Sequence, residues 1–166
     1  MDCTIDRIFC FPVKQLVEKI LGDFNSEKIM FVVTGGEPLL QREIGTLTDG
    51  LRTAGLHVTV ETAGTIDPDF SCDLLSVSPK TGNSDPPGPR RARHQRLRRD
   101  LGPLGRLLER FPEHQLKFVV ESADDMPDVF AILDAVGGIQ RWRVQLMAQG
   151  RSAAEVAGRA PAVAAL

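Results

Sequence analysis

The segment Thr34–Pro38 carries the first residues whose types and spacing could do chemistry. Its two glycines, Gly35 and Gly36, let a ligand approach the backbone closely and allow positive φ angles. Pro38 suits the first position of a helix, where free backbone N–H groups would face the same space as the Glu37 carboxylate. A carboxylate beside a glycine turn suits a cationic ammonium group, whereas a phosphate-binding loop ends in lysine. A strand-to-helix turn in which Glu37 only stabilises the helix dipole explains the same residues.

Three later segments place polar or polarisable side chains directly after strand-like runs. The run Glu61–Thr65 offers a second carboxylate and hydroxyls, although a capped turn explains it as well. The hydroxyl and ammonium groups of Ser78–Lys80 could bind a carboxylate or ribose oxygens. In Met147–Gly150, the thioether of Met147 could pack on a flat ring, and the amide of Gln149 could form hydrogen bonds with polar atoms at the edge of such a ring. The alternative for Met147 is ordinary packing in the core.

Lys117 is a charged residue inside an apolar run, Leu116–Val120. Burying an ammonium group is costly unless it is paired or reaches a polar cavity. A lysine that faces water from an edge strand is the simpler alternative.

The composition describes one ordinary globular domain. The chain has 166 residues, with 20 Lys and Arg against 22 Asp and Glu, which gives a net charge of −2. This balance argues against a globally basic nucleic-acid-binding protein. No apolar run is long enough to span a bilayer and the start does not resemble a signal peptide, so we expect a cytoplasmic protein without a membrane partner. Three scattered cysteines, Cys3, Cys10 and Cys72, do not suggest a disulfide framework.

Strand-like and helix-like patterns alternate along the chain. Continuous or alternating apolar runs predict strands at Ile29–Val33, His57–Glu61, Leu74–Val77, Leu116–Val120 and Trp142–Leu146. Apolar residues at helical spacing predict helices at Val13–Leu21, Leu40–Ala54 and Leu101–Phe111, and two more after the capping residues Ser122 and Ser152. The segment 81–100 interrupts this alternation with a Pro- and Gly-rich loop and an arginine-rich run, which we interpret as an insertion.

Alternation with short connections predicts an α/β fold with a parallel sheet and right-handed crossovers. Ligands of such sheets bind at the carboxyl ends of the strands. We therefore expect Glu37, Glu61, Lys80 and Gln149 to meet at one edge of one sheet.

The ordered set of motifs resembles a known family. Thr34–Pro38 with its flanking residues resembles the GGEP motif of radical S-adenosylmethionine enzymes. The other motifs narrow the resemblance to 7-carboxy-7-deazaguanine synthases of queuosine biosynthesis, over about Val13 to Arg151. The residues that carry it are Phe31–Gln41, Glu61–Thr65, Ser76–Lys80, Gln115–Val120 and Leu146–Gly150. The resemblance implies a single partial TIM-like (β/α) barrel, a radical S-adenosylmethionine domain that spans residues 1–166.

The resemblance also implies roles for individual residues. Those implied to contact S-adenosyl-L-methionine are Gly35, Gly36, Glu37, Ser78, Pro79, Lys80, Met147, Ala148, Gln149 and Gly150. Those implied to contact a pterin substrate are Thr34, Glu61 and Thr62. No residue is assigned as catalytic.

The implied reaction is that of a carbon–nitrogen lyase. The family converts 6-carboxy-5,6,7,8-tetrahydropterin to 7-carboxy-7-deazaguanine with loss of ammonia, and it uses S-adenosyl-L-methionine, a 4Fe–4S cluster and Mg²⁺. An external electron donor of the flavodoxin type is implied as a partner. The difficult chemistry belongs to the cofactors, while a protein of this kind supplies position and a dry site.

The sequence departs from the family pattern in three respects. The family carries a C-x3-C-x2-C loop before the GGEP strand, which Cys3 and Cys10 do not match, so neither cluster ligands nor the magnesium-binding hydroxyl are assigned. Ala148 stands where the family usually has proline, and the chain stops where the family continues to a last strand. We therefore expect a chain that is truncated at both ends and inactive alone, through a wrong start codon, a frameshift or gene decay.

Other functions fit parts of the same pattern. A non-catalytic S-adenosylmethionine-binding module or remnant would keep the pocket without redox chemistry, and a glycyl-radical activase would need a protein partner in place of a pterin. The run Gly82–Arg99 is either a solvated insertion or an attractive surface for an anionic substrate or tRNA. Exposed sheet edges predict poor solubility or association, with a homodimer as one form of association.

Overall fold

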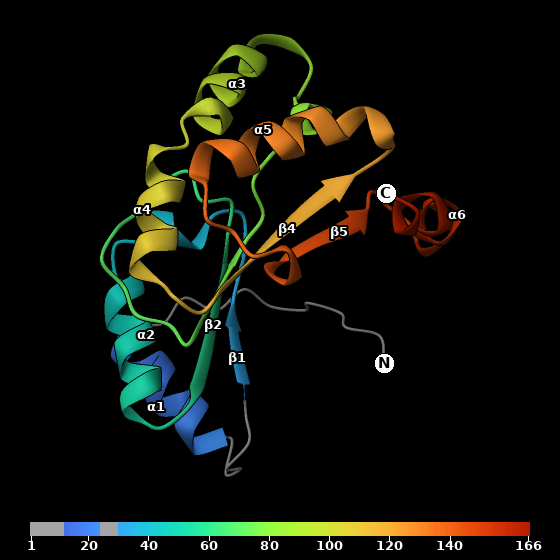
Figure 1. Ribbon diagram of the computed structural model, residues 1–166. Coiled ribbons are helices and arrows are strands. Elements are labelled where there is room, and N and C mark those ends of the chain that lie inside the picture. The colour runs from blue at the N-terminus through green and yellow to red at the C-terminus, as the bar shows by residue number, and fades with distance from the viewer. Residues whose placement is uncertain (1–11, 24–29) are drawn as a thin grey trace.

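A five-stranded parallel sheet organises the protein. The computed structural model describes residues 12–23 and 30–166. The strands are β1 (Met30–Val33), β2 (His57–Thr62), β3 (Leu74–Val77), β4 (His114–Val120) and β5 (Val144–Ala148). They lie in chain order, and each is parallel to its neighbour. This arrangement is that of consecutive units of a (β/α) barrel and confirms the predicted fold class (Figure 1).

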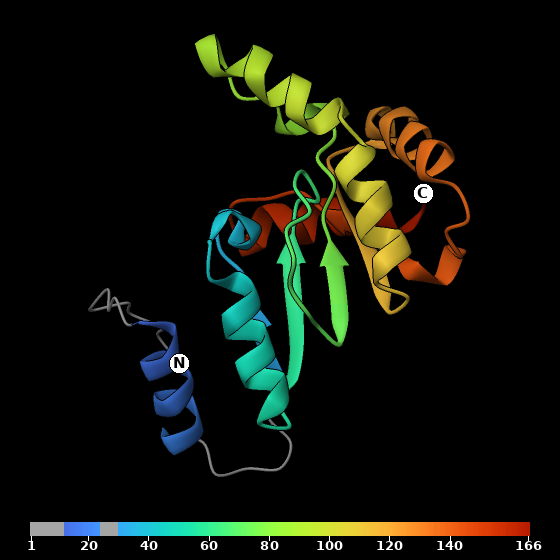
Figure 2. The same ribbon diagram turned by 90° about the vertical axis from the view of Figure 1, so that its left-hand side faces the viewer.

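Helices connect the strands. They are α1 (Val13–Asp23), α2 (Ile44–Thr53), α3 (Arg91–Arg99), α4 (Gly102–Arg110), α5 (Met126–Val136) and α6 (Ala153–Ala164). Helix α1 packs against α2, and α6 packs beside β5. Helix α3 projects from one end of the molecule, as both side views show (Figures 1 and 2). Among the described residues, no helix combines the length and apolar character needed to cross a membrane.

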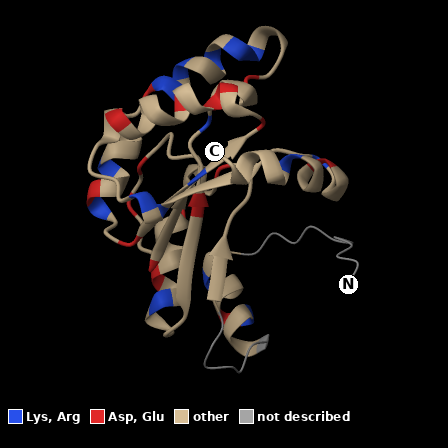
Figure 3. Ribbon diagram, turned by 45° about the vertical axis from the view of Figure 1, so that its right-hand side comes forward, with Lys and Arg blue, Asp and Glu red and all other residues tan. Residues whose placement is uncertain are grey.

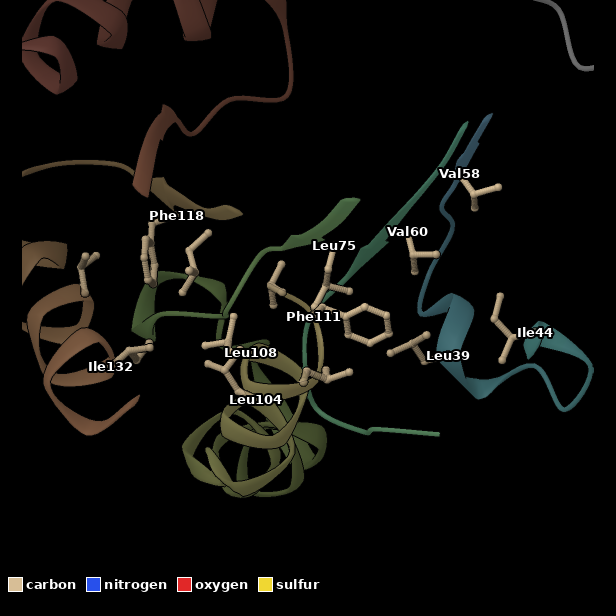
Figure 4. Close-up of a cluster of buried hydrophobic side chains, with 14 of the residues drawn as sticks. Leu39, Ile44, Val58, Val60, Leu75, Leu104, Leu108, Phe111, Phe118 and Ile132 are labelled. Carbon is tan, nitrogen blue, oxygen red and sulfur yellow. The ribbon is translucent and has the colours of Figure 1, made fainter. Parts of the chain in front are cut away.

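The two faces of the sheet differ in character. On one face, apolar side chains of the strands, among them Val60, Leu75 and Phe118, are fully buried. They pack against leucines of α2 and α4 and against Val129 and Ile132 of α5 (Figure 4). The pairing register places the other residues of the strands on the opposite face.

That second face carries mainly polar side chains, and we call it the polar sheet face. Its polar residues are His57, Thr59, Glu61, Ser76, Gln115, Lys117 and Gln145. Parallel sheets usually bury apolar residues on both faces, so this row of polar groups is unusual for such a sheet.

Several element boundaries differ from the prediction. The second helix begins at Ile44 rather than Leu40, because Pro38–Leu40 forms a separate 3₁₀ turn. Trp142 and Arg143 belong to another 3₁₀ turn, so β5 begins only at Val144. The edge-strand alternative for Lys117 is wrong, because β4 lies between β3 and β5.

The arginine-rich run is helical. After two 3₁₀ turns, Gly82–Ser84 and Gly88–Arg90, the chain forms α3. None of the side chains of α3 is fully buried. A nine-residue helix without a buried face is too short to be stable by itself, so other contacts must hold it.

The two predicted capping residues act as caps. The Ser152 hydroxyl accepts a hydrogen bond from the Glu155 backbone N–H at 3.2 Å, at the start of α6. Ser122 forms a capping box with Asp125, in the 3₁₀ turn that leads into α5.

Candidate functional site

The turn after β1 borders a large hollow. This hollow has a volume of about 890 Å³ and is lined by Val13, Val33, Thr34, Gly35, Gly36, Glu37, Pro38, Leu40, Gln41, Arg42, Glu43, Ile44 and Leu47. Gly35 has a φ of +153°, which favours glycine, and no atom lies within 4 Å of where a Cβ would stand on either glycine. The backbone of the turn is therefore open to a ligand.

The Glu37 carboxylate is tied to the end of β2. Its Oε1 accepts hydrogen bonds from the Thr62 hydroxyl at 2.7 Å and from the Leu39 N–H at 3.2 Å. Its Oε2 accepts one from the Ala63 N–H at 2.9 Å. An ionised carboxylate offers about four lone-pair positions. Within the described residues one position on Oε2 has no donor, and the Thr62 hydroxyl is engaged by Glu37.

Lys117 and Glu61 form an ion pair across the polar sheet face. The Lys117 Nζ lies 2.8 Å from Glu61 Oε1, although their strands are separated by β3. On the intervening strand β3, Ser76 is the register partner of both Glu61 and Gln115. The hydrogen bond from Lys117 lowers the pKa of Glu61 against an opposing effect of burial, and the Thr34 hydroxyl lowers it further. Glu61 is therefore held as an anion at neutral pH.

Two amides continue the polar row beside this ion pair. Gln115 Nε2 donates to the Ser76 hydroxyl at 3.1 Å, and Gln145 Nε2 donates to Gln115 Oε1 at 3.0 Å. Neither amide is among the site residues that the sequence predicted. The alternation of polar and apolar residues over Gln115–Phe118 is the signal that could have found Gln115, because a parallel strand with this pattern exposes one polar face.

A second hollow, of about 310 Å³, brings together two of the segments predicted from the sequence. Ser78, Pro79 and Lys80 line it together with Gln149, as do Thr81, Asn83, Ser84, His94 and Val119. The predicted insertion thus contributes to the wall of this hollow. Glu37 borders the larger hollow instead, and Glu61 is in the lining of neither hollow.

Asp85 holds α3 in place beside the second hollow. Its side chain is only 6% exposed and accepts hydrogen bonds from His94 at 3.0 Å, Gln95 at 2.6 Å and Arg98 at 2.9 Å. Burial would raise the pKa of Asp85, but these hydrogen bonds hold it well below its usual range. Arg98 also reaches Asp128 at 3.3 Å, which connects α3 to α5. Figure 3 shows the other basic residues of α3 gathered at this end of the molecule.

The last predicted segment is divided between two environments. Met147 and Ala148 line a third hollow, of about 470 Å³, beside α6. The carbonyl oxygens of the Gln149 backbone and side chain both accept hydrogen bonds from Arg159. Gly150 approaches α6 closely, since a Cβ there would lie 2.7 Å from Val156 Cγ2.

The described residues offer no site for a metal or an iron–sulfur cluster. No group of three or more His, Cys, Asp and Glu residues among them could hold a metal ion. Burial raises the pKa of Cys72 to about 12, so its thiol is protonated at neutral pH and is a poor ligand. Cys3 and Cys10 lie outside the described residues.

Comparisons with known proteins agree on one family. No family model matches the chain. The chain is 40% identical over 153 residues to a 7-carboxy-7-deazaguanine synthase of Rhodopirellula baltica, with 89% of the chain and 59% of that protein covered. It is 35% identical over 170 residues to the protein of the same name from Pyrobaculum aerophilum, with 92% of the chain and 69% of that protein covered.

A solved structure shows the same fold. The crystal structure of QueE from Escherichia coli matches with a TM-score of 0.61 at 19% identity, over 92% of the chain and 59% of that structure. The chain therefore spans about three fifths of the length of the Rhodopirellula protein and of this structure.

Proposed function

Because the chain belongs to the 7-carboxy-7-deazaguanine synthase family, we propose that its strand ends bind S-adenosyl-L-methionine and a carboxylated pterin. The proposed reaction is the conversion of 6-carboxy-5,6,7,8-tetrahydropterin to 7-carboxy-7-deazaguanine with release of ammonia. The observation that carries the proposal is the Glu37 carboxylate, which lines an open hollow of about 890 Å³ and is oriented by three hydrogen bonds from described residues.

Glu37 would hold the methionine ammonium of the cofactor. Three neutral donors orient its carboxylate, and these hydrogen bonds cannot neutralise its charge. A cationic ammonium group would supply the compensating positive charge, and the open backbone of Gly35 and Gly36 would let this group approach. The preorganisation of Glu37 by Thr62 and Ala63 reduces the entropy lost on binding.

The second hollow would bind the remaining polar groups of the same cofactor. Ser78 and Lys80 present a hydroxyl and an ammonium there, and Pro79 stiffens the turn between them. Gln149 contributes its amide N–H₂, because its carbonyl oxygen is engaged by Arg159. Met147, Ala148 and Gly150 would lie toward the adenosine side.

Thr34 and Glu61 would contact the pterin. S-adenosyl-L-methionine, held by Glu37, Ser78 and Lys80, would supply the radical chemistry of the proposed reaction. The described residues do not fit a cluster or a Mg²⁺ site, so no step is derived through either group. A flavodoxin-type donor and a homodimer belong to the proposal on family resemblance alone.

Titration calorimetry of the purified chain with S-adenosyl-L-methionine tests the proposal. We expect measurable binding that Lys80→Met weakens about 10- to 150-fold, the effect of one lost charge-assisted hydrogen bond. Lys14→Met, an exposed lysine on α1, is the matched control and should bind as the wild type does. Glu37→Gln should weaken binding as well. No heat from the wild-type chain, or equal affinity of the two lysine variants, would contradict the assignment.

A further inference from the structure

Helix α3 has one side that is anchored to the rest of the molecule. The residues of this side, whose side chains all reach the Asp85 carboxylate, are Arg91, His94, Gln95 and Arg98. Residues three and four apart lie on the same side of a helix. These contacts therefore decide which side of α3 faces solvent.

The opposite side of α3 carries four arginines, and we call it the arginine face. It consists of Arg90, Arg93, Arg96 and Arg99. All four residues are exposed, and their guanidinium groups have no ion-pair or hydrogen-bond partner within residues 12–23 and 30–166. A step of three residues turns the helix by about 300°, so these groups spread over about half of its circumference.

The arginine face costs α3 stability. Its arginines repel one another at a spacing of three residues, and the first turn of the helix, where acidic residues are favourable, contains none. Outside residues 90–99 the chain has more acidic than basic residues, yet in its described part none of them pairs with this face. A local excess of arginine that no contact neutralises is typical of a surface that binds an anion.

The shape of the arginine face favours one kind of anion. A lipid surface would need an apolar face, and between the arginines this side of the helix offers only Ala92 and Leu97. The flat surface of an acidic protein would meet only some of the guanidinium groups, since they spread around the helix. The groove of a nucleic acid has phosphates on both walls and can meet them all. Helix α3 projects from one end of the molecule, so it can enter a groove while the sheet stays outside (Figures 1 and 2).

We propose that α3 places its arginine face in the major groove of double-stranded DNA. The nine residues of α3 are about 13.5 Å long, and a helix with its side chains is about 10 to 12 Å wide. The major groove of B-form DNA is about 12 Å wide and admits such a helix, whereas that of double-stranded RNA is deep and narrow. The dimensions therefore fit DNA rather than RNA.

The position of each arginine on the helix assigns its role. Arg90 and Arg99 lie at the two edges of the arginine face, where they would contact phosphates on the two walls of the groove. Arg93 and Arg96 lie between them and would face the bases, where a guanidinium group donates two hydrogen bonds to O6 and N7 of guanine. The arrangement predicts weak, salt-dependent binding with a preference for G·C base pairs.

Fluorescence anisotropy of a labelled DNA duplex of about 20 base pairs tests the proposal. Two phosphate contacts predict that the affinity falls about 10-fold between about 50 and 200 mM salt. The wild-type chain should bind a G·C-rich duplex at least about 5-fold more tightly than an A·T duplex. Arg93→Ala with Arg96→Ala should remove this preference. Arg90→Ala with Arg99→Ala should weaken binding of both duplexes and flatten the salt dependence.

Arg141→Ala with Arg151→Ala is the matched control. It removes two exposed arginines outside α3, so the net charge changes by the same amount while the affinity should stay that of the wild type. Alanine favours the helical state, and circular dichroism confirms that each variant is folded.

Three results would overturn the proposal. They are the absence of wild-type binding at about 50 mM salt, an equal loss of affinity in the control and in the α3 variants, and equally tight binding of double-stranded RNA of the same sequence. Polyglutamate that displaces the DNA at an equal concentration of charge would also overturn it and would assign the arginine face to an acidic protein instead.

Discussion

Replacing Asp85 by alanine would remove the group that holds α3 against the rest of the molecule. His94, Gln95 and Arg98 all direct their side chains to this one carboxylate. Because α3 buries none of its side chains fully, apolar contacts cannot substitute for the lost hydrogen bonds. We therefore expect Asp85→Ala to open the segment 81–100 locally before the sheet unfolds.

The structure sets the size of this effect. Breaking a buried ion pair by removing one partner costs about 3 to 5 kcal/mol. Here His94 is 30% exposed and Arg98 retains Asp128, so a loss of about 2 to 4 kcal/mol is expected for Asp85→Ala. Asp85→Asn keeps one acceptor oxygen and should cost roughly half as much.

The stabilisation by Asp85 also depends on pH. Hydrogen bonds depress the pKa of Asp85 in the folded protein below its ordinary value of 3.8. A carboxyl group whose pKa is lower in the folded protein stabilises the fold fully at pH values above its unfolded-state pKa. This contribution is lost as the pH falls toward the pKa of the folded protein. The difference in stability between the wild type and Asp85→Ala should thus be constant from pH 8 to 5 and shrink below about pH 4.

Limited proteolysis with trypsin measures the opening of α3, which carries several exposed arginines. When trypsin cleaves only molecules in which α3 is locally unfolded, the cleavage rate is proportional to their population. This rate should increase roughly 30- to 900-fold in Asp85→Ala, which corresponds to 2 to 4 kcal/mol. Asp134→Ala, at an exposed aspartate of α5, is the matched control and should be cleaved at the wild-type rate. Cleavage of α3 at equal rates in Asp85→Ala and Asp134→Ala would refute the view that Asp85 holds this helix.

Two further predictions concern the core beside the site. Gly64→Ala should lower the free energy of unfolding by about 2 to 4 kcal/mol in urea, because Gly64 has a φ of +71° and a Cβ would lie 2.8 Å from Val77 Cγ1. Gly55 also has a positive φ, but a Cβ there meets no atom within 4 Å, so Gly55→Ala should lower the free energy of unfolding by only about 1 to 2 kcal/mol. Equal losses in the two variants would show that the structure relieves the close approach at Gly64. In a Cys3→Ser, Cys10→Ser background, the Cys72 thiol should react with iodoacetamide at pH 8 roughly a thousandfold more slowly than an ordinary thiol, since burial raises its pKa to about 12. Urea should restore the ordinary rate, and rapid alkylation of the folded chain would argue that Cys72 is accessible as thiolate.

Local signals determined much of the fold and part of the site. The continuous apolar run of β1 and the alternating run of β2 stand out, because the face of a parallel strand that helices cover needs β-branched and aliphatic residues. Glycines and prolines at the strand ends indicated the turns of the candidate site, since these residues have narrow or unusual backbone preferences. The helical state of the arginine-rich run was missed, because its stability comes from Asp85 rather than from an apolar stripe.

By itself, the sequence determined the order of strands and helices, the turns that border the two hollows and the family to which the motifs point. The tertiary structure alone decided which polar groups meet: Glu37 with Thr62, Lys117 with Glu61 across an intervening strand, and Gln145 with Gln115. The physical reason is that strand identity follows from local periodicity, whereas these contacts follow from the register between strands distant in sequence. With 20 basic and 22 acidic residues, the sequence allows many different ion pairs. Only the packing of the sheet decides which of them form.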